Sequence, residues 1–445
     1  MPKITHRKKR LSSFKLIVLG FAGVIVLGAL ILMLPFSSTA GVVTPFHEAL
    51  FTSTSAVCVT GLVVQDTGSY WARFGHTVIL LLIQIGGLGV VTVAALFAML
   101  SGRKISLMQR STMQDAISAP KVGGIVRLTR FIVRGTFLIE LIGMIVMLPT
   151  FCGNYGIKGI WMAAFHSVSA FCNAGFDILG TAENKYPSLT GYIGNPAINI
   201  TIMLLIIVGG IGFLTWDDIY TNKWHFKKYR MQSKVILVTT AILIIAPAVF
   251  FFFCDFTGLP LAERILASLF QSVTPRTAGF NTADLPAMTG SSKAIMTLLM
   301  LVGGSPGSTA GGMKTTTLAV LILSAFSVCR KKDDAEVCGR RIDGSTVKNA
   351  AAVAVMYFLL FFVGGIVIST AEGLPLSTCL YETASAVGTV GLTLGITPQL
   401  GVLSQLILIV LMYLGRVGGL TLIYAAVSNK NQSGAKLPLE KITVG

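Results

Sequence analysis

The chain has 445 residues, of which 53% are hydrophobic and only 12% are charged, and its formal net charge is +17 at pH 7. A soluble domain carries about 25% charged residues, so the composition excludes an ordinary soluble protein and indicates an integral membrane protein. A nucleic-acid-binding protein would interleave its basic residues with aromatic residues on one surface, and because this chain does not, we expect no nucleic acid partner.

The basic residues alternate with the hydrophobic segments. Of the 35 lysines and arginines, 27 lie in residues 1–15, 101–134, 217–234, 327–348 and the C-terminal tail. Basic residues concentrate in cytoplasmic loops, so the pattern predicts a multi-pass protein of the cell membrane with both termini in the cytoplasm. The first apolar run, Phe14–Phe36, is longer than the ~7–15-residue core of a signal peptide, and we interpret it as a membrane helix.

Along the chain, hydrophobic segments follow one order four times: a long segment, a half-length segment that ends at a glycine, and a second long segment. The predicted elements are Phe14–Phe36, Thr44–Gly61 and Thr77–Leu100; Val126–Phe151, Gly159–Gly175 and Ala197–Trp216; Met231–Cys254, Leu261–Gly279 and Lys293–Val328; and Val347–Thr370, Leu376–Gly391 and Leu400–Val427. The middle segments are too short to span a bilayer, which needs about 20 residues, and are predicted to be re-entrant half-helices.

This repetition predicts an all-α integral membrane protein with four repeats of helix, re-entrant pore half-helix and helix, giving eight transmembrane helices around one central pore. The predicted divisions are repeat 1 with the cytoplasmic N-terminus (1–100), a cytoplasmic linker with repeat 2 (101–216), a linker with repeat 3 and an intramembrane gate loop (217–328), a linker with repeat 4 (329–427), and a cytoplasmic tail (428–445).

Each half-helix ends in a three-residue stretch, here named a glycine segment. The four glycine segments are Val59, Thr60 and Gly61; Asn173, Ala174 and Gly175; Thr277, Ala278 and Gly279; and Thr389, Val390 and Gly391. A half-helix directs the negative end of its dipole at the pore, and extended backbone beyond it can offer carbonyl oxygens to a dehydrated cation. Without Asp or Glu, the segments predict a filter that binds K⁺ through backbone oxygens alone.

Charged residues near the glycine segments leave two interpretations open. Arg276 lies within the third segment, and we expect its side chain to point away from the pore axis toward a hydrogen-bonding or carboxylate partner. Glu48, Glu263 and Glu382 lie near the half-helices, where they could attract cations, cap helix ends or pair with arginine.

A run of small and polar residues interrupts the third closing segment after Gly303. Proline and repeated glycines cannot continue a helix, so the sequence predicts an unwound loop at membrane depth, beside the pore. The candidate gate residues in it are Gly304, Ser305, Pro306, Gly307, Ser308, Thr309, Ala310, Gly311 and Gly312. A passive kink is the alternative. The spacing also resembles a phosphate-binding loop, but Met313 separates the last glycine from Lys314, so we reject a nucleotide site.

Arg416 is the last candidate gate residue and lies within the fourth closing segment. Insertion scales put the free energy of an arginine at mid-membrane about 2.5–3.5 kcal/mol above that of an apolar residue, so such a residue normally has a function. It occupies the place of Gly87, Gly210 and Gly304 in the other repeats. It could raise an electrostatic barrier to cations, anchor the loop by hydrogen bonds, or do both.

Other classes of protein fit the sequence less well. The five histidines are scattered and the seven cysteines include no Cys-x-x-Cys pair, so we predict no enzyme, no catalytic residue and no resident metal or cofactor. An alternating-access carrier would show a two-part repeat with acidic or aromatic residues at mid-membrane, rather than four glycine segments.

Together, the fourfold repeat, the four glycines, the loop after Gly303 and Arg416 resemble the Trk/Ktr/HKT superfamily of potassium transporters over residues 14–427. The length and motifs are most similar to the membrane subunit of bacterial Ktr potassium uptake systems. In this superfamily a serine in place of the first filter glycine accompanies sodium selectivity. The resemblance therefore implies potassium selectivity here, because Gly61, Gly175, Gly279 and Gly391 are all glycine.

The resemblance also implies partners and regulation. It implies a homodimer with one pore per protomer, on a cytoplasmic octameric ring of RCK (KTN) subunits that bind ATP, ADP or NAD-type nucleotides, and a role in osmotic adaptation. K⁺ would be the transported ion, and Na⁺ is a candidate activator. The main hypothesis is a gated potassium-selective uptake subunit, and the alternative within the same fold is a Na⁺-permeable or poorly selective cation transporter.

Overall fold

The computed structural model describes residues 13–101, 105–117, 123–419 and 421. The first half of the chain contains α1 (Ser13–Leu32), η1 (Pro35–Ser37), α2 (Phe46–Cys58), α3 (Thr67–Tyr70), α4 (Arg73–Leu88), α5 (Val90–Leu100), α6 (Leu107–Ile117), α7 (Ile125–Tyr155), α8 (Lys158–Phe171), η2 (Thr190–Tyr192), α9 (Pro196–Gly210) and α10 (Phe213–Asn222).

The second half is also almost entirely helical, with one short antiparallel hairpin. It contains η3 (Phe226–Lys228), α11 (Met231–Cys254), α12 (Leu261–Val273), α13 (Gly290–Leu301), α14 (Thr315–Cys329), β1 (Glu336–Val337), β2 (Arg340–Arg341), α15 (Gly344–Glu372), α16 (Leu376–Gly388), η4 (Thr397–Gln399) and α17 (Val402–Val417).

Four helices, α1, α7, α11 and α15, are long and apolar enough to cross a membrane, and the bent pairs α4 with α5 and α9 with α10 raise that number to six among the described residues. Many large apolar side chains of these helices are exposed, as expected for surfaces that face lipid. The prediction of a helical membrane protein is confirmed.

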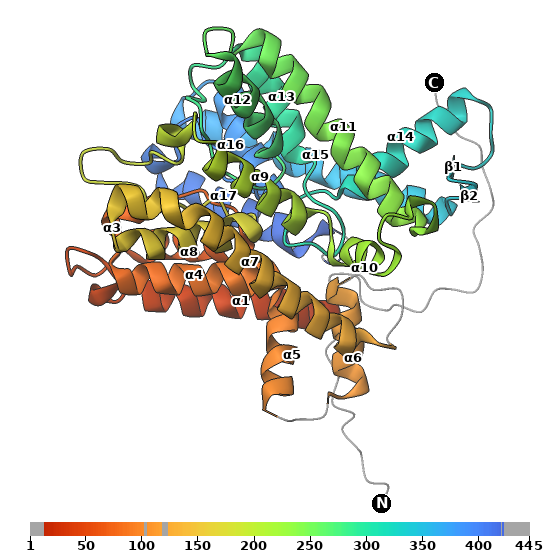
Figure 1. Ribbon diagram of the computed structural model, residues 1–445, viewed down its shortest axis with the longest axis horizontal. Coiled ribbons are helices and arrows are strands. Elements are labelled where there is room, and N and C mark those ends of the chain that lie inside the picture. The colour runs from red at the N-terminus through yellow and green to blue at the C-terminus, as the bar shows by residue number, and fades with distance from the viewer. Residues whose placement is uncertain (1–12, 102–104, 118–122, 420, 422–445) are drawn as a thin grey trace, which may run out of the picture.

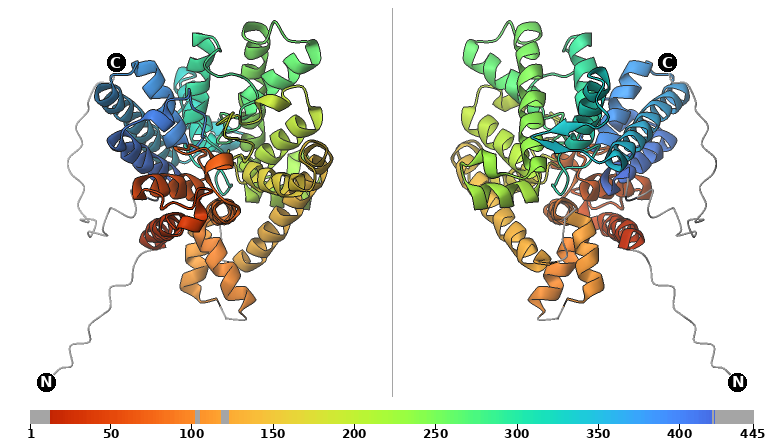
Figure 2. Two further views of the ribbon diagram at one scale, coloured as in Figure 1. Left: turned by 90° about the vertical axis from the view of Figure 1, so that its left-hand side faces the viewer. Right: turned by 90° about the vertical axis from the view of Figure 1, so that its right-hand side faces the viewer.

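A shorter helix packs against each of the four long helices: α2 on α1, α8 on α7, α12 on α11 and α16 on α15. Each shorter helix begins within three residues of its predicted start. Helices α2, α8 and α16 also end within three residues of the glycine segment that follows them, whereas α12 ends earlier, at Val273. The successive parts of the chain follow one another around a common centre in Figure 2, from the red N-terminal helices through green α11 to the blue C-terminal helices. In Figure 1, α5 and α6 project away from this centre.

The prediction that the first two closing segments are continuous helices is wrong. The first bends by 96° between α4 and α5, and the second bends by 98° between α9 and α10. Gly89 and Gly212 lie at the two bends with φ of 84° and 93°. A residue with a Cβ rarely adopts such angles, so these glycines end one helix and let the next start in a new direction.

The third closing segment is unwound where the sequence predicts. Helix α13 ends at Leu301, α14 begins at Thr315, and the residues between them are held by a parallel bridge of Val302 with Met313. In the fourth, α17 ends at Val417. The N-terminal residues 1–12 and the tail 428–445, both predicted to be cytoplasmic, lie outside the residues that the structure describes.

Candidate functional site

The glycines of the four glycine segments lie around one centre. A Cβ built on Gly61 would lie 2.5 Å from the carbonyl oxygen of Ala174. Each glycine faces the carbonyl oxygen of the residue before the next glycine, in the pairs Gly61 with Ala174, Gly175 with Ala278, Gly279 with Val390, and Gly391 with Thr60. Because the fourth contact returns to the first segment, the four segments form a closed ring, here named the glycine ring.

The residue two positions before each glycine has a left-handed backbone conformation. These residues are Val59, Asn173, Thr277 and Thr389, with φ of 58°, 61°, 68° and 52°. Three of the four are β-branched, for which this conformation is a genuine outlier. Strain of this kind persists only where the surroundings hold the backbone in place, and it concentrates at functional sites.

Hydroxyl groups attach each half-helix to the long helix before it. A hydroxyl seven or eight residues before the glycine donates to a carbonyl of that long helix, in the pairs Ser53 with Ile25 (2.7 Å), Ser167 with Glu140 (2.6 Å), Ser272 with Ile244, and Thr383 with Phe361 (3.0 Å). These hydroxyls place the half-helices, so they fix the position from which each glycine segment starts. They were not among the predicted site residues.

A second hydroxyl, two positions further on, fixes the glycine segment itself. Ser55 and Ser385 each accept a hydrogen bond of 3.0 Å from the backbone N–H of Gly61 and Gly391, respectively. Ser169 donates instead to the carbonyl of Phe176 at 2.7 Å, and Thr274 donates to that of Phe280. The signal for both sets is a Ser or Thr pair, separated by one residue, that recurs before every glycine segment.

Glu382, on α16, is fully buried and braces the chain beyond the fourth segment. Its carboxylate accepts from the Thr393 hydroxyl (2.5 Å), the Leu394 backbone N–H (3.0 Å) and the Thr397 hydroxyl (2.7 Å). It therefore accepts hydrogen bonds from the loop that follows the fourth segment, and it forms no ion pair with an arginine in the part of the chain that the structure describes.

The other two acidic residues near the half-helices lie in the first turns of their helices, Glu48 in α2 and Glu263 in α12. Acidic residues in this position stabilise the positive end of the helix dipole. Glu48 also accepts a hydrogen bond of 2.9 Å from the Gln65 side chain, which ties the start of α2 to the chain beyond Gly61.

Arg276, which was expected to point away from the pore axis toward a hydrogen-bonding or carboxylate partner, is buried and donates to the hydroxyl of Thr240 on α11 at 3.3 Å. Within the described residues it forms no ion pair. Its partner is thus a neutral hydroxyl behind the half-helix α12, which keeps the charge away from the facing carbonyl oxygens of the glycine ring.

The residues Gly303–Gly312, here named the intramembrane loop, lie against two opposite glycine segments. The Thr309 hydroxyl donates to Asn173 Oδ1 at 3.3 Å, in the second segment. Gly311 packs against the side chain of Thr389, in the fourth. The loop therefore reaches from one side of the ring to the other.

Two cationic side chains hold this loop. Arg416 donates to the carbonyl oxygens of Thr309 and Gly86, and more weakly to that of Gly87 at 3.3 Å. Lys314 donates to the carbonyl of Ala310 at 2.8 Å. These hydrogen bonds fit the role of an anchor for the loop. Arg416 also lines a cavity, so its charge is placed where it could form an electrostatic barrier to cations.

Cavities lie on both sides of the glycine ring. One, of about 240 Å³, is lined by all four ring glycines together with Asp66 and Asp177. The other, of about 310 Å³, is lined by residues of the intramembrane loop and by Lys314 and Arg416. The first cavity thus has two acidic residues in its wall, whereas the second has Lys314 and Arg416 together with one acidic residue, Asp115.

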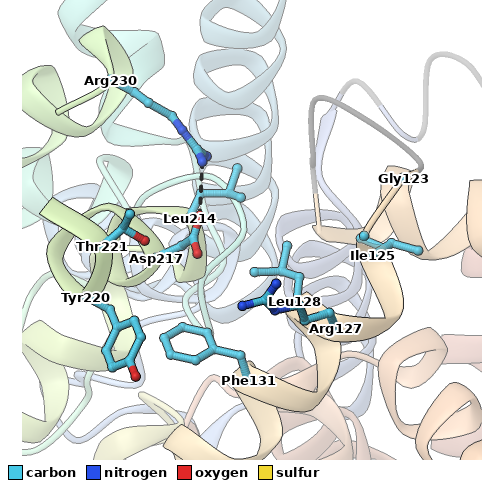
Figure 3. A pocket seen from close by; sticks show the side chains of 11 residues that line it. Gly123, Ile125, Arg127, Leu128, Phe131, Leu214, Asp217, Tyr220, Thr221 and Arg230 are labelled. Atoms are coloured by element: carbon cyan, nitrogen blue, oxygen red, sulfur yellow. Dashed lines mark hydrogen bonds and ion pairs between the residues drawn. The ribbon is translucent and has the colours of Figure 1, made fainter. Parts of the chain in front are cut away.

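A further cavity, of about 660 Å³, lies between the start of α7 and α10 (Figure 3). Phe131 and Tyr220 form one wall with their rings 5.5 Å apart, and an ion pair of Arg230 with Asp217 lies in another. None of its lining residues belongs to a glycine segment or to the intramembrane loop, so it lies outside the candidate site.

Comparisons with known proteins agree with this geometry. The family model "TrkH: Cation transport protein" matches residues 17–434. The chain is 39% identical to the potassium/sodium uptake protein NtpJ of Enterococcus hirae, over 98% of each chain. It is 36% identical to the Ktr system potassium uptake protein B of Bacillus subtilis, over 97% of this chain and 96% of the relative.

The fold is also similar to the crystal structure of the potassium transporter TrkH from Vibrio parahaemolyticus, with a TM-score of 0.74 and 19% identity over 96% of this chain and 87% of that one. The family match covers most of the chain, and the curated relatives cover nearly all of it. The chain therefore belongs to the TrkH family of cation transport proteins and is a transporter, not an enzyme.

Proposed function

We propose that this chain is the potassium-selective, ion-conducting membrane subunit of a gated potassium uptake system. The observation that carries the proposal is the closed ring of four glycine segments, in which the carbonyl oxygen before each glycine faces the glycine of a neighbouring segment. A dehydrated cation needs several such oxygens at once. The C-terminal ends of α2, α8, α12 and α16 precede the ring, and their dipoles favour positive charge there.

The ring also supports a four-repeat architecture with eight membrane-spanning units around one pore. The same hydroxyl contact to the preceding long helix recurs in all four parts of the chain. A left-handed backbone conformation also recurs two positions before each glycine. Four equivalent contacts of this kind are expected when one structural unit is repeated, and an unrelated succession of helices has no reason to contain them.

The cavities on the two sides of the ring suggest the ion path. A cation would enter the cavity that has Asp66 and Asp177 in its wall and would then pass through the ring. Beyond the ring it would meet the intramembrane loop, which lines the cavity that contains Lys314 and Arg416. Negative charge at an entrance concentrates cations, and positive charge beyond the ring opposes them. We therefore assign the loop and Arg416 as the gate.

The names of the relatives support potassium as the ion, since one is a potassium uptake protein and another is a potassium/sodium uptake protein. The second name favours the alternative function, a Na⁺-permeable or poorly selective transporter. All four ring positions are glycine, which leaves the ring without side chains that would distort it, and we therefore favour potassium selectivity.

The names of the relatives also bear on regulation by partner proteins. Three relatives are named as proteins of Ktr systems, which supports cytoplasmic regulatory subunits. We propose a homodimer on a ring of nucleotide-binding subunits of the RCK type, in the cell membrane, with cytoplasmic termini and stimulation by Na⁺.

Growth of a bacterium that lacks its own potassium uptake systems tests this function. Expression of the chain with its regulatory subunits should restore growth at low external potassium, and Gly279→Asp should abolish it, because an acidic side chain would enter the ring. Equal growth with the wild type and Gly279→Asp would reject the assignment of the ring as the filter.

A further inference from the structure

We propose that Asn173 is a specificity-determining residue whose side chain, held by Thr309, links the position of the intramembrane loop to the ion selectivity of the glycine ring. The inference rests on the proposed function, since it assigns a selectivity role within the same site. It concerns a side chain, whereas the proposed filter uses backbone oxygens.

Asn173 differs from its three equivalents in what its side chain can do. The corresponding left-handed positions hold Val59, Thr277 and Thr389, and only the asparagine offers both a carbonyl oxygen and an amide group. The carboxamide is buried. Its Nδ2 donates to Thr277 Oγ1 at 3.2 Å, and its Oδ1 accepts from the Thr309 hydroxyl at 3.3 Å.

One side chain therefore joins three parts of the site. The bond to Thr277 connects the second glycine segment to the third, two positions before Gly175 and Gly279. The bond to Thr309 connects the second segment to the intramembrane loop, across 136 residues of sequence. No comparable hydrogen bond from the loop to the first or third segment is present among the described residues.

Thr309 is also attached to the surrounding chain through its backbone. Its backbone N–H donates to the carbonyl of Gly209 at 3.2 Å, and its own carbonyl accepts from Arg416. Its single hydroxyl hydrogen is shared between two acceptors, the carbonyl of Phe171 at 3.1 Å and Asn173 Oδ1 at 3.3 Å. A movement of the loop that releases Arg416 therefore also displaces the hydroxyl that holds Asn173.

Loss of this contact would affect the ring. A buried carboxamide without its donor reorients or draws in water, because an unsatisfied buried polar group is unfavourable. Reorientation weakens the bond to Thr277 and with it the spacing between Gly175 and Gly279. Discrimination between K⁺ and Na⁺ depends on the number and placement of the coordinating oxygens, so the loop position would change selectivity together with flux.

The test compares ⁸⁶Rb⁺ and ²²Na⁺ flux through the purified full-length chain in liposomes. Thr309→Val keeps the shape of the side chain and removes its hydroxyl, whereas Thr309→Ser keeps the hydroxyl. Thr309→Val should lower the Rb⁺/Na⁺ flux ratio by about three- to tenfold, the size expected from one buried hydrogen bond, and Thr309→Ser should retain the wild-type ratio.

Thr297→Val is the matched control. The Thr297 hydroxyl donates to the Lys293 carbonyl within α13, and Thr297 belongs neither to a glycine segment nor to the intramembrane loop, so its loss should leave flux and ratio unchanged. An unchanged ratio in Thr309→Val would overturn the inference. An equal loss in Thr309→Val and Thr309→Ser would also overturn it, because packing rather than the hydroxyl would then set the ratio.

A double-mutant cycle with Asn173→Ala tests whether the two residues act through one contact. Residues that act through one contact have non-additive effects, so Asn173→Ala with Thr309→Val should be no less selective than Asn173→Ala alone. Additive losses would contradict the link. A wild type that shows no preference for Rb⁺ would reject the proposed function itself, which separates the two failures.

Discussion

The carbonyl oxygen of Ala278 lies against the α-carbon of Gly175, so close that a Cβ on that glycine would be 2.6 Å from it. Gly175 also has a φ of 68°. A side chain at this position must therefore displace the neighbouring segment as well as strain its own backbone.

Gly175→Ala is expected to reduce ion selectivity for this reason. Displacement of the third segment would leave the carbonyl oxygens at unequal distances from a bound ion, and the Rb⁺/Na⁺ flux ratio should fall by an order of magnitude. Gly373→Ala is the control, because Gly373 has a similar φ of 67° with open space around it. Equal effects of the two variants would show that backbone strain, and not the contact within the ring, is responsible.

Arg416→Lys should raise the basal flux of the chain without regulatory subunits. Arginine donates from two separate nitrogens to the loop and to α4, and a lysine ammonium cannot reproduce that fork. The charge is retained, so a role as a purely electrostatic barrier predicts unchanged flux instead. The comparison is made in liposomes with Arg264→Lys, in which the arginine donates to the Phe252 carbonyl outside the site.

Deletion of Pro306–Ser308 shortens the intramembrane loop without removing Thr309. The shortened loop should no longer close the path, so Rb⁺ flux through liposomes in the absence of any partner should rise severalfold. Lower or unchanged flux would favour a passive kink over a gate.

Glu382→Gln should destabilise the protein by about 1–3 kcal/mol, the range expected when a buried donor loses its acceptor. The carboxylate accepts three hydrogen bonds from the loop beyond the fourth segment, and a glutamine can accept through only one of its two terminal atoms. Thermal unfolding in detergent measures the change. Glu263→Gln, at a partly exposed first-turn position, should shift the midpoint far less.

Much of the architecture could be predicted from the sequence because one ambiguous pattern occurs four times at equivalent places. A single half-length apolar segment that ends at glycine is ambiguous, but four of them at equivalent places predicted helices α2, α8, α12 and α16 closely. The three glycine-segment residues of each repeat were named for the same reason, and the structure brings the four segments together in one ring.

The bends at Gly89 and Gly212 could not be predicted in the same way. A glycine in a membrane helix equally allows close helix packing, and both uses occur here: Gly86 packs against the carbonyl of Val57, while Gly89 ends the helix. Which glycine does which depends on tertiary contacts. The hydrogen bond from Thr309 to Asn173 could not be predicted from the sequence either, because only the folded chain brings these two residues together.

The central claim, that the glycine ring selects potassium, is tested most directly by cation flux through the purified chain in liposomes. Flux of K⁺ and Rb⁺ should far exceed that of Na⁺, and addition of the cytoplasmic regulatory subunits should change its size but not this order. Na⁺ flux equal to that of K⁺, with or without those subunits, would contradict the claim and make the chain a non-selective cation transporter of the same fold.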